Sequence, residues 1–130
     1  MWMVVRVQDT DVLRAVLDQW KAGIDAHDPQ HVAEVFTEDA IFQGLRPYSV
    51  GRDGIATYYD GQPLGMTVSY RVLETRSPTE ELAVGYVRAD FAYPDRATVT
   101  LNLGVVVTCT DAGWRILHYQ ASPVVNSARG

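Results

Sequence analysis

The residue best suited to acid–base chemistry is His118, near the end of the segment Gly113–Ser122. An imidazole exchanges its proton near neutral pH, so it can act as a general acid or base where it faces a substrate. The segment is rich in aromatic and aliphatic residues, which predicts a β-strand. Side chains alternate along a strand, so His118 and Gln120 should share a face with Trp114 and Ile116. We predict a catalytic His118 with Gln120 beside it in a pocket; the alternative is a buried histidine satisfied by its neighbours.

A second polar group precedes this strand. Tyr86, Arg88 and Asp90 are two residues apart in one predicted strand, so they share a face. They form either a polar site for a ligand, with a buried Arg–carboxylate pair, or an exposed and screened surface pair. Asn102 belongs to a strand with one polar and one apolar face, and either face could line a cavity. We place Asn102 in the pocket as a ligand-binding residue, because it should lie opposite the strand of His118.

Aromatic residues supply a possible wall for the pocket. They lie on elements expected to close around it, where they either pack the core or bind a flat ligand. The residues are Trp20, Phe42, Tyr58 and Tyr59. His27 and His31 have the spacing of a helical metal pair, but Asp28–Pro29 starts a new helix between them. We therefore expect no metal site and no cofactor.

Hydrophobic periodicity predicts the elements that position these residues. Apolar residues at intervals of three and four predict a helix over residues 9–26, and Asp28–Pro29 starts a second helix that ends near Phe36. A short strand at residues 40–43 precedes a third helix, which begins near Arg52. The remainder predicts antiparallel strands joined by turns. These strands are Thr67–Arg76, Glu81–Tyr93, Ala97–Thr110 and Gly113–Ser122.

The length of the strand Ala97–Thr110 determines the predicted architecture. Fully extended, it would span roughly 45 Å at about 3.3 Å per residue, whereas a compact chain of this size has a radius of gyration of only about 14 Å. The sheet must therefore coil strongly, with Gly85 and Gly104 as candidate bends or bulges. We predict an α+β cone, in which three N-terminal helices pack on a strongly curved antiparallel sheet around a cavity.

The composition indicates a single domain spanning residues 1–130. A net charge of -5 provides no basic surface for nucleic acid. No stretch is long enough to cross a membrane, and the apolar run at the start is too short for a signal peptide, so we expect a cytoplasmic protein. Cys109 is the only cysteine, which excludes an internal disulfide, and its apolar surroundings predict a buried thiol.

Several segments together resemble the nuclear transport factor 2-like superfamily, specifically its SnoaL-like and SgcJ/EcaC-type members. Phe36–Phe42 is similar to the helix-to-strand junction of this group, and Gly51–Ile55 followed by Tyr58–Tyr59 is similar to its third-helix signature. Gly113–Ile116 followed by His118–Ser122 resembles its closing strand. The resemblance covers about residues 9–123 and implies the cone-shaped fold. It also implies a homodimer built across the sheet, since many members pair in this way.

The resemblance further implies a protein that binds a hydrophobic small molecule in polyketide-type secondary metabolism, such as antibiotic biosynthesis. One hypothesis is an enzyme that catalyses a proton-transfer, cyclisation or hydration step. A SnoaL-type cyclase needs a carboxylate beside its histidine, and Asp90 is the candidate for that role. The alternative is a non-catalytic dimeric ligand-binding or accessory module. Strand alternation places Leu117, Tyr119 and Ala121 on the outer face of the sheet, where they would form the dimer interface.

Overall fold

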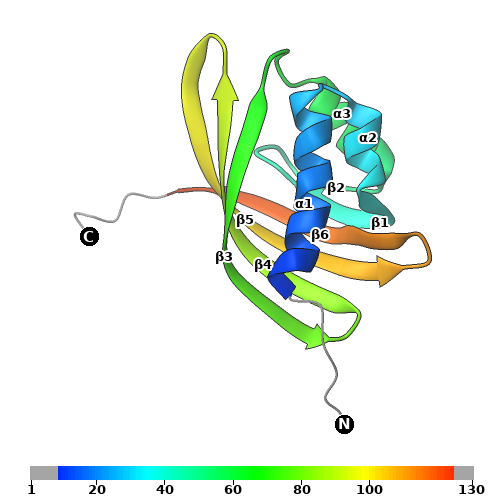
Figure 1. Cartoon of the computed structure of the whole chain (residues 1–130). Helices are drawn as coiled ribbons and strands as arrows, with labels where there is room; N and C mark the ends of the chain where they lie inside the picture. The colour runs from blue at the N-terminus through cyan, green and yellow to red at the C-terminus, as the bar shows by residue number, and fades with distance from the viewer. Residues whose placement is uncertain (1–8, 125–130) are drawn as a thin grey trace.

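The computed structural model describes residues 9–124, in which helices lie together on the concave side of a curved six-stranded sheet (Figure 1). The apolar run at the start of the chain lies outside these residues. The predicted α+β cone is confirmed. The helices are α1 (Asp9–Asp25), α2 (Pro29–Glu34) and α3 (Arg52–Asp60). The strands are β1 (Phe36–Gln43), β2 (Ser49–Val50), β3 (Thr67–Thr79), β4 (Leu82–Tyr93), β5 (Arg96–Thr110) and β6 (Gly113–Pro123).

The strand order across the sheet is β2-β1-β6-β5-β4-β3. The strands from β3 to β6 form an antiparallel meander, as predicted, whereas β1 pairs with β6 in parallel. The first strand begins earlier than expected because α2 ends at Glu34 and the carbonyl of Val35 already accepts the amide of Ile116 at 2.9 Å. The sequence analysis missed β2, since two residues are too few to show alternation. Cys109, predicted to be buried, is exposed near the outer end of β5.

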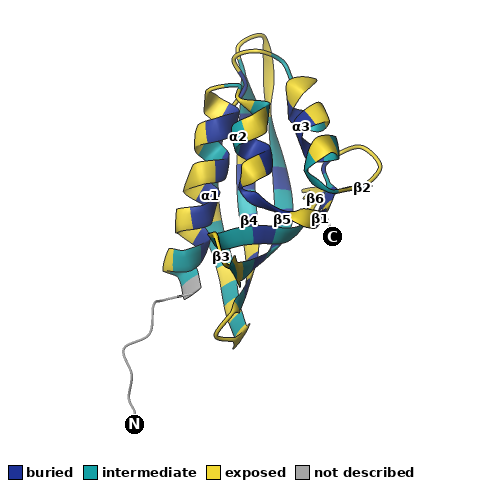
Figure 2. Cartoon of the chain, turned by 90° about the vertical axis from the view of Figure 1, so that its right-hand side faces the viewer, coloured by how far each residue is buried: buried dark blue, intermediate teal, exposed yellow. Residues whose placement is uncertain are grey.

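The apolar stripe of α1 faces the sheet as its periodicity predicted. Figure 2 shows the buried side of α1 turned inward and its exposed side turned to solvent. Leu13, Val16, Leu17, Trp20 and Ile24 are all buried, at no more than 5% exposure. The carboxylate of Asp28 accepts the backbone amide of His31 at 3.1 Å, which confirms the predicted cap of α2. None of the helices in the described part of the chain is long and apolar enough to cross a membrane.

Close contacts hold α1 against the strands that it covers. A Cβ atom at Gly85 in β4 would lie 2.7 Å from Cδ1 of Leu13, so the missing side chain is what lets α1 approach the sheet. At the C-terminal end of α1, Asp25 Oδ1 accepts the amide of Val68 at 3.0 Å and Lys21 Nζ donates to the carbonyl of Val68 at 2.6 Å. Helix side chains thus pair with backbone groups of β3, which is an edge strand of the sheet.

The predicted bulges at Gly85 and Gly104 are wrong, because β4 and β5 keep one continuous register from Leu82 to Phe91. A bulge does occur in β6. Val106 pairs with His118 and Val107 pairs with Ile116, so Leu117 is one extra residue between them. A bulge bends its strand and increases the local twist. Here it lies where β6 must pair with both β5 and β1.

Candidate ligand-binding site

The bulge at Leu117 reverses the alternation on which the predicted site depended. Ile116 is fully buried, but after the extra residue it is Tyr119, 2% exposed, that points into the fold. His118 is half-buried on the outer face, where it pairs with Val106, and Gln120 is exposed. The prediction that His118 and Gln120 line the cavity is therefore wrong. The prediction that Tyr119 and Ala121 face outward is also wrong, since both are buried.

The second polar group also lies on the outer face. Tyr86 is 45% exposed, and Arg88 Nε donates to Asn102 Oδ1 at 2.7 Å rather than pairing with Asp90. The carboxylate of Asp90 accepts the hydroxyl of Thr100 at 2.6 Å. Placing Asn102 in the cavity was wrong, because the apolar side of β5 faces the helices and its polar side faces outward. Asp90 and His118 are therefore not positioned to act on a ligand inside the cone.

The interior of the cone contains a cavity of about 190 Å³. It lies between α3, the loops that follow β1 and precede β3, and the inward faces of β4, β5 and β6. Aromatic and aliphatic side chains make most of its wall. The lining residues are Gly44, Leu45, Arg46, Tyr58, Tyr59, Gln62, Met66, Phe91, Tyr93, Val99, Leu101 and Tyr119.

Tyrosine hydroxyls are the deepest polar groups of this cavity. Tyr59 is 5% exposed, and its hydroxyl accepts the indole N–H of Trp20 at 3.1 Å. Burial raises the pKa of Tyr59, and the hydrogen bond from Trp20 opposes that rise only in part. Burial also raises the pKa of Tyr119, to which the neighbouring Tyr59 adds. Both side chains are therefore neutral hydrogen-bonding groups across the physiological pH range.

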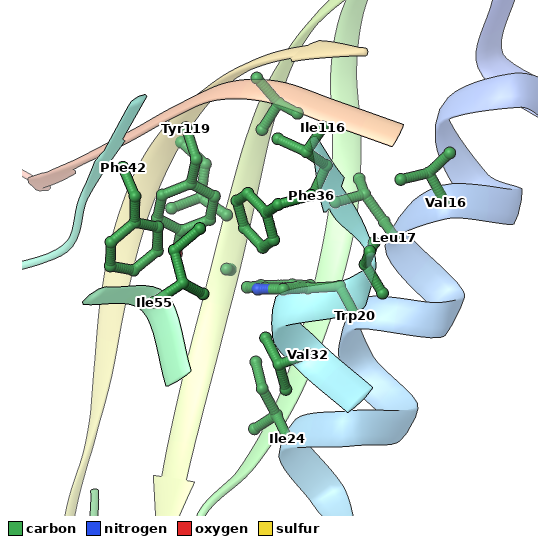
Figure 3. Packing of buried hydrophobic residues seen from close by; sticks show 14 of the residues in the cluster. Val16, Leu17, Trp20, Ile24, Val32, Phe36, Phe42, Ile55, Ile116 and Tyr119 are labelled. Carbon is green, nitrogen blue, oxygen red and sulfur yellow. The ribbon is translucent and has the colours of Figure 1, made fainter. Parts of the chain in front are cut away.

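Aromatic contacts hold these tyrosines in place. Phe42 stacks on Tyr119, with ring centroids 4.9 Å apart and planes at 20°, and Phe36 packs edge-on against both rings. Figure 3 shows Phe36 and Phe42 of β1 and Trp20 of α1 converging on Tyr119 of β6. Of the predicted ligand-binding aromatics, Tyr58 lines the cavity, whereas Trp20 and Phe42 support its wall from behind.

Polar groups also lie at the end of the cavity formed by the loops. The hydroxyl of Tyr58 accepts the amide of Leu45 at 3.3 Å, and a Cβ atom at Gly44 would collide with that hydroxyl. Glycine at this position therefore lets the loop close against α3. Arg46 lines both the cavity and an adjoining groove, and within residues 9–124 no carboxylate forms an ion pair with it. Arg46 is the one charged side chain among the described residues that line the cavity.

Most residues of the cavity wall were not identified from the sequence. Arg46, Gln62 and Met66 lie in or beside loops, which carry no alternation from which to infer direction. Strand alternation indicated that Tyr119 faces the side opposite to His118 and Gln120. Which of the two sides faces the cavity was decided by the bulge at Leu117. Within residues 9–124 no group of His, Cys, Asp and Glu side chains is close enough to hold a metal ion.

Fold and cavity together define a small α+β cone domain with a partly open pocket, walled mainly by aromatic and aliphatic side chains. A sequence profile of the SnoaL-like domain matches residues 5–120. The chain therefore belongs to the SnoaL-like domain family. No curated protein matches its sequence.

Solved structures with the same fold are distant in sequence. A domain of unknown function with a cystatin-like fold from Nostoc punctiforme has a TM-score of 0.82 at 22% identity, covering 96% of this chain and 83% of that chain. A nuclear transport factor 2-like protein of unknown function from Shewanella oneidensis has a TM-score of 0.76 at 17% identity, covering 88% and 99%. A ketosteroid isomerase-like protein from Erwinia carotovora has a TM-score of 0.71 at 16% identity, covering 92% and 98%. At these identities the likeness shows the fold alone.

Proposed function

We propose that this protein binds a compact aromatic small molecule inside the cone and does not transform it by acid–base catalysis. The observation that carries the proposal is the cavity of about 190 Å³, walled by Tyr58, Tyr59, Phe91, Tyr93 and Tyr119. Aromatic walls with a few polar groups are typical of sites for flat organic ligands. The SnoaL-like fold and the ketosteroid isomerase-like neighbour are consistent with a small-molecule ligand.

The volume of the cavity favours a ligand with one ring. An apolar protein cavity of about 150 Å³ accommodates benzene, and drug-sized ligands occupy pockets of about 300–1,000 Å³. At about 190 Å³ this cavity suits a substituted benzene better than a fused-ring polyketide. A role in polyketide-type secondary metabolism remains a hypothesis based on the family resemblance, and it would involve a small precursor or fragment. A cytoplasmic location is part of the same proposal.

Binding is favoured over proton transfer by the ionisable groups in the wall. Among the described residues that line the cavity, none is Asp, Glu, His or Lys. A general acid or base works best with a pKa near the operating pH, but burial raises the pKa of Tyr59 and Tyr119. The enzymatic alternative would need a catalytic group supplied by the ligand or by a partner.

We also propose that the protein is a homodimer, paired through the outer face of the sheet. Paired residues from β2 to β4 form one row across this face, which is apolar except for His118 and ends at Arg76 in β3. The row consists of Val50, Ile41, His118, Val106 and Val84. Ile41 and Val84 in this row are 45% and 36% exposed, and Val50 at the sheet edge is 61% exposed. A contiguous apolar strip on a sheet favours burial against a partner, and a two-fold axis would bury the same strip on both copies. The interface residues differ from the predicted ones, because Tyr119 and Ala121 point inward.

Calorimetric titration with small aromatic compounds tests the ligand proposal. A ligand of eight or nine non-hydrogen atoms at about 0.6 kcal/mol per atom would bind with a Kd of about 0.1–1 mM. Val99→Trp should fill the cavity and abolish binding. Thr98→Trp is the matched control, because Thr98 is the adjacent residue of β5 and is exposed. Equal binding by both variants, or no binding by the wild type, would refute the proposal.

A further inference from the structure

Within residues 9–124 the buried hydroxyl of Tyr59 accepts a hydrogen bond but donates none. The oxygen of Tyr59 already accepts the indole N–H of Trp20 at 3.1 Å. Among residues 9–124 this is the one side-chain hydrogen bond that the Tyr59 hydroxyl makes, and in it the oxygen is the acceptor. The O–H proton of Tyr59 therefore has no acceptor in the described part of the chain.

A buried donor without an acceptor is costly, because folding removes it from water without replacing its hydrogen bond. Tyr59 is 5% exposed and lines the cavity, so space for an acceptor is available only within the cavity. Its position is rigid, since Trp20 holds the hydroxyl and Phe42 and Tyr58 pack against the ring with centroids 5.6 and 5.1 Å away. Such a donor selects for an oxygen atom at one defined place on a ligand.

We infer that Tyr59 donates a hydrogen bond to a carbonyl or phenolic oxygen of the ligand, so the cavity selects an oxygen-bearing single-ring aromatic compound over a hydrocarbon of the same shape. This inference rests on the proposed function and adds the chemical class of the ligand. The ring lies among Phe91, Tyr93 and Leu101, and the oxygen lies toward α3. The donor remains protonated throughout the physiological range, because burial raises its pKa.

The test compares acetophenone with α-methylstyrene, which has the same shape but carries a methylene group in place of the carbonyl oxygen. The measured quantity is the ratio of their dissociation constants within each variant, so effects of a substitution on cavity shape cancel. In the double variant Tyr59→Phe/Tyr119→Phe the preference for acetophenone should fall about five- to tenfold, the value of one neutral hydrogen bond. Both residues are replaced because Tyr119, without Tyr59, could turn its own proton toward the ligand.

Single variants assign the donor. Tyr119→Phe leaves the proton of Tyr59 in place and should keep the wild-type ratio. Tyr93→Phe is the matched control, because it removes a hydroxyl from the same cavity wall. It should also keep that ratio. A full loss of the preference in Tyr119→Phe would overturn the assignment to Tyr59.

The infrared carbonyl band of bound acetophenone provides a measurement on the wild-type protein that does not depend on the folding of any variant. The band should lie below its position in an apolar solvent, as expected of a carbonyl that accepts a hydrogen bond. An unshifted band, or an unchanged ratio in the double variant, would overturn this inference while leaving the proposed function intact. Failure of both compounds to bind would instead refute the proposed function.

Discussion

Replacing Trp20 with alanine should remove a large part of the free energy of unfolding. The side chain is fully buried, and its ring lies 6.5, 6.0 and 5.9 Å from those of Tyr70, Phe91 and Tyr119. Truncating a buried tryptophan costs about 3–5 kcal/mol. The indole also donates to Tyr59, and deleting that donor leaves a buried acceptor without its partner. We therefore expect a loss near the upper end, about 4–5 kcal/mol.

That loss is large against the whole stability of a domain of this size, which is about 5–15 kcal/mol. Chemical denaturation followed by far-ultraviolet circular dichroism measures this loss. If the free energy of unfolding falls with denaturant at the same slope in both proteins, their folded and unfolded states are comparable. Gln19→Ala is the control, because Gln19 is the exposed neighbour on α1 and should change stability by no more than about 0.5 kcal/mol. A loss below about 1 kcal/mol in Trp20→Ala would refute the central position of this residue in the core.

The hydrogen bond can be separated from the packing by a double-mutant cycle. Trp20→Phe keeps an aromatic ring but removes the indole N–H, and Tyr59→Phe removes the hydroxyl that accepts it. The two substitutions should be non-additive by about 1 kcal/mol, the net value of one buried hydrogen bond. Strict additivity would show that the contact at 3.1 Å contributes nothing to stability.

Three further predictions concern pH, packing and assembly. Stability should be flat below about pH 10 and fall above it, because Tyr59 and Tyr119 ionise near pH 10 when unfolded but at higher pH when folded. The pair should contribute about 2.7 kcal/mol per pH unit to that slope. In the double Phe variant the slope should fall by this amount, and Tyr70 and Tyr93, whose pKa values burial also raises, should supply the remainder, as alkaline titration of unfolding can show. Gly85→Ala should cost about 1–3 kcal/mol, since the new methyl group would lie 2.7 Å from Leu13, whereas Gly104→Ala, with no atom within 4 Å, should be neutral by denaturation. Light scattering should give twice the mass of 14.4 kDa for the wild type and the monomer mass for Ile41→Arg, which places a charge in the apolar row of the outer face.

Local sequence signals were enough for the elements and the architecture. The spacing of Leu13, Val16, Leu17 and Trp20 predicted which side of α1 is buried, because a helix repeats every 3.6 residues whatever it packs against. The predicted strands β3 to β6 differ from the observed ones only at their ends, since turn residues separate them. The length of β5 predicted a curved sheet, because a flat one could not be covered by so short a chain.

The candidate site depended on which face of β6 points into the cone, and only the tertiary structure decided that. Leu117 has no glycine or proline beside it to mark a bulge, and its extra position arises from pairing β6 with β5 and β1 at once. One inserted residue exchanges the two faces of the strand beyond it, so Tyr119 replaces His118 and Gln120 in the cavity. The sequence by itself determined the fold, because periodicity and turn chemistry are local. The tertiary structure determined the site, because the direction of Tyr119 and the positions of Tyr59 and Arg46 depend on contacts between segments distant in the chain.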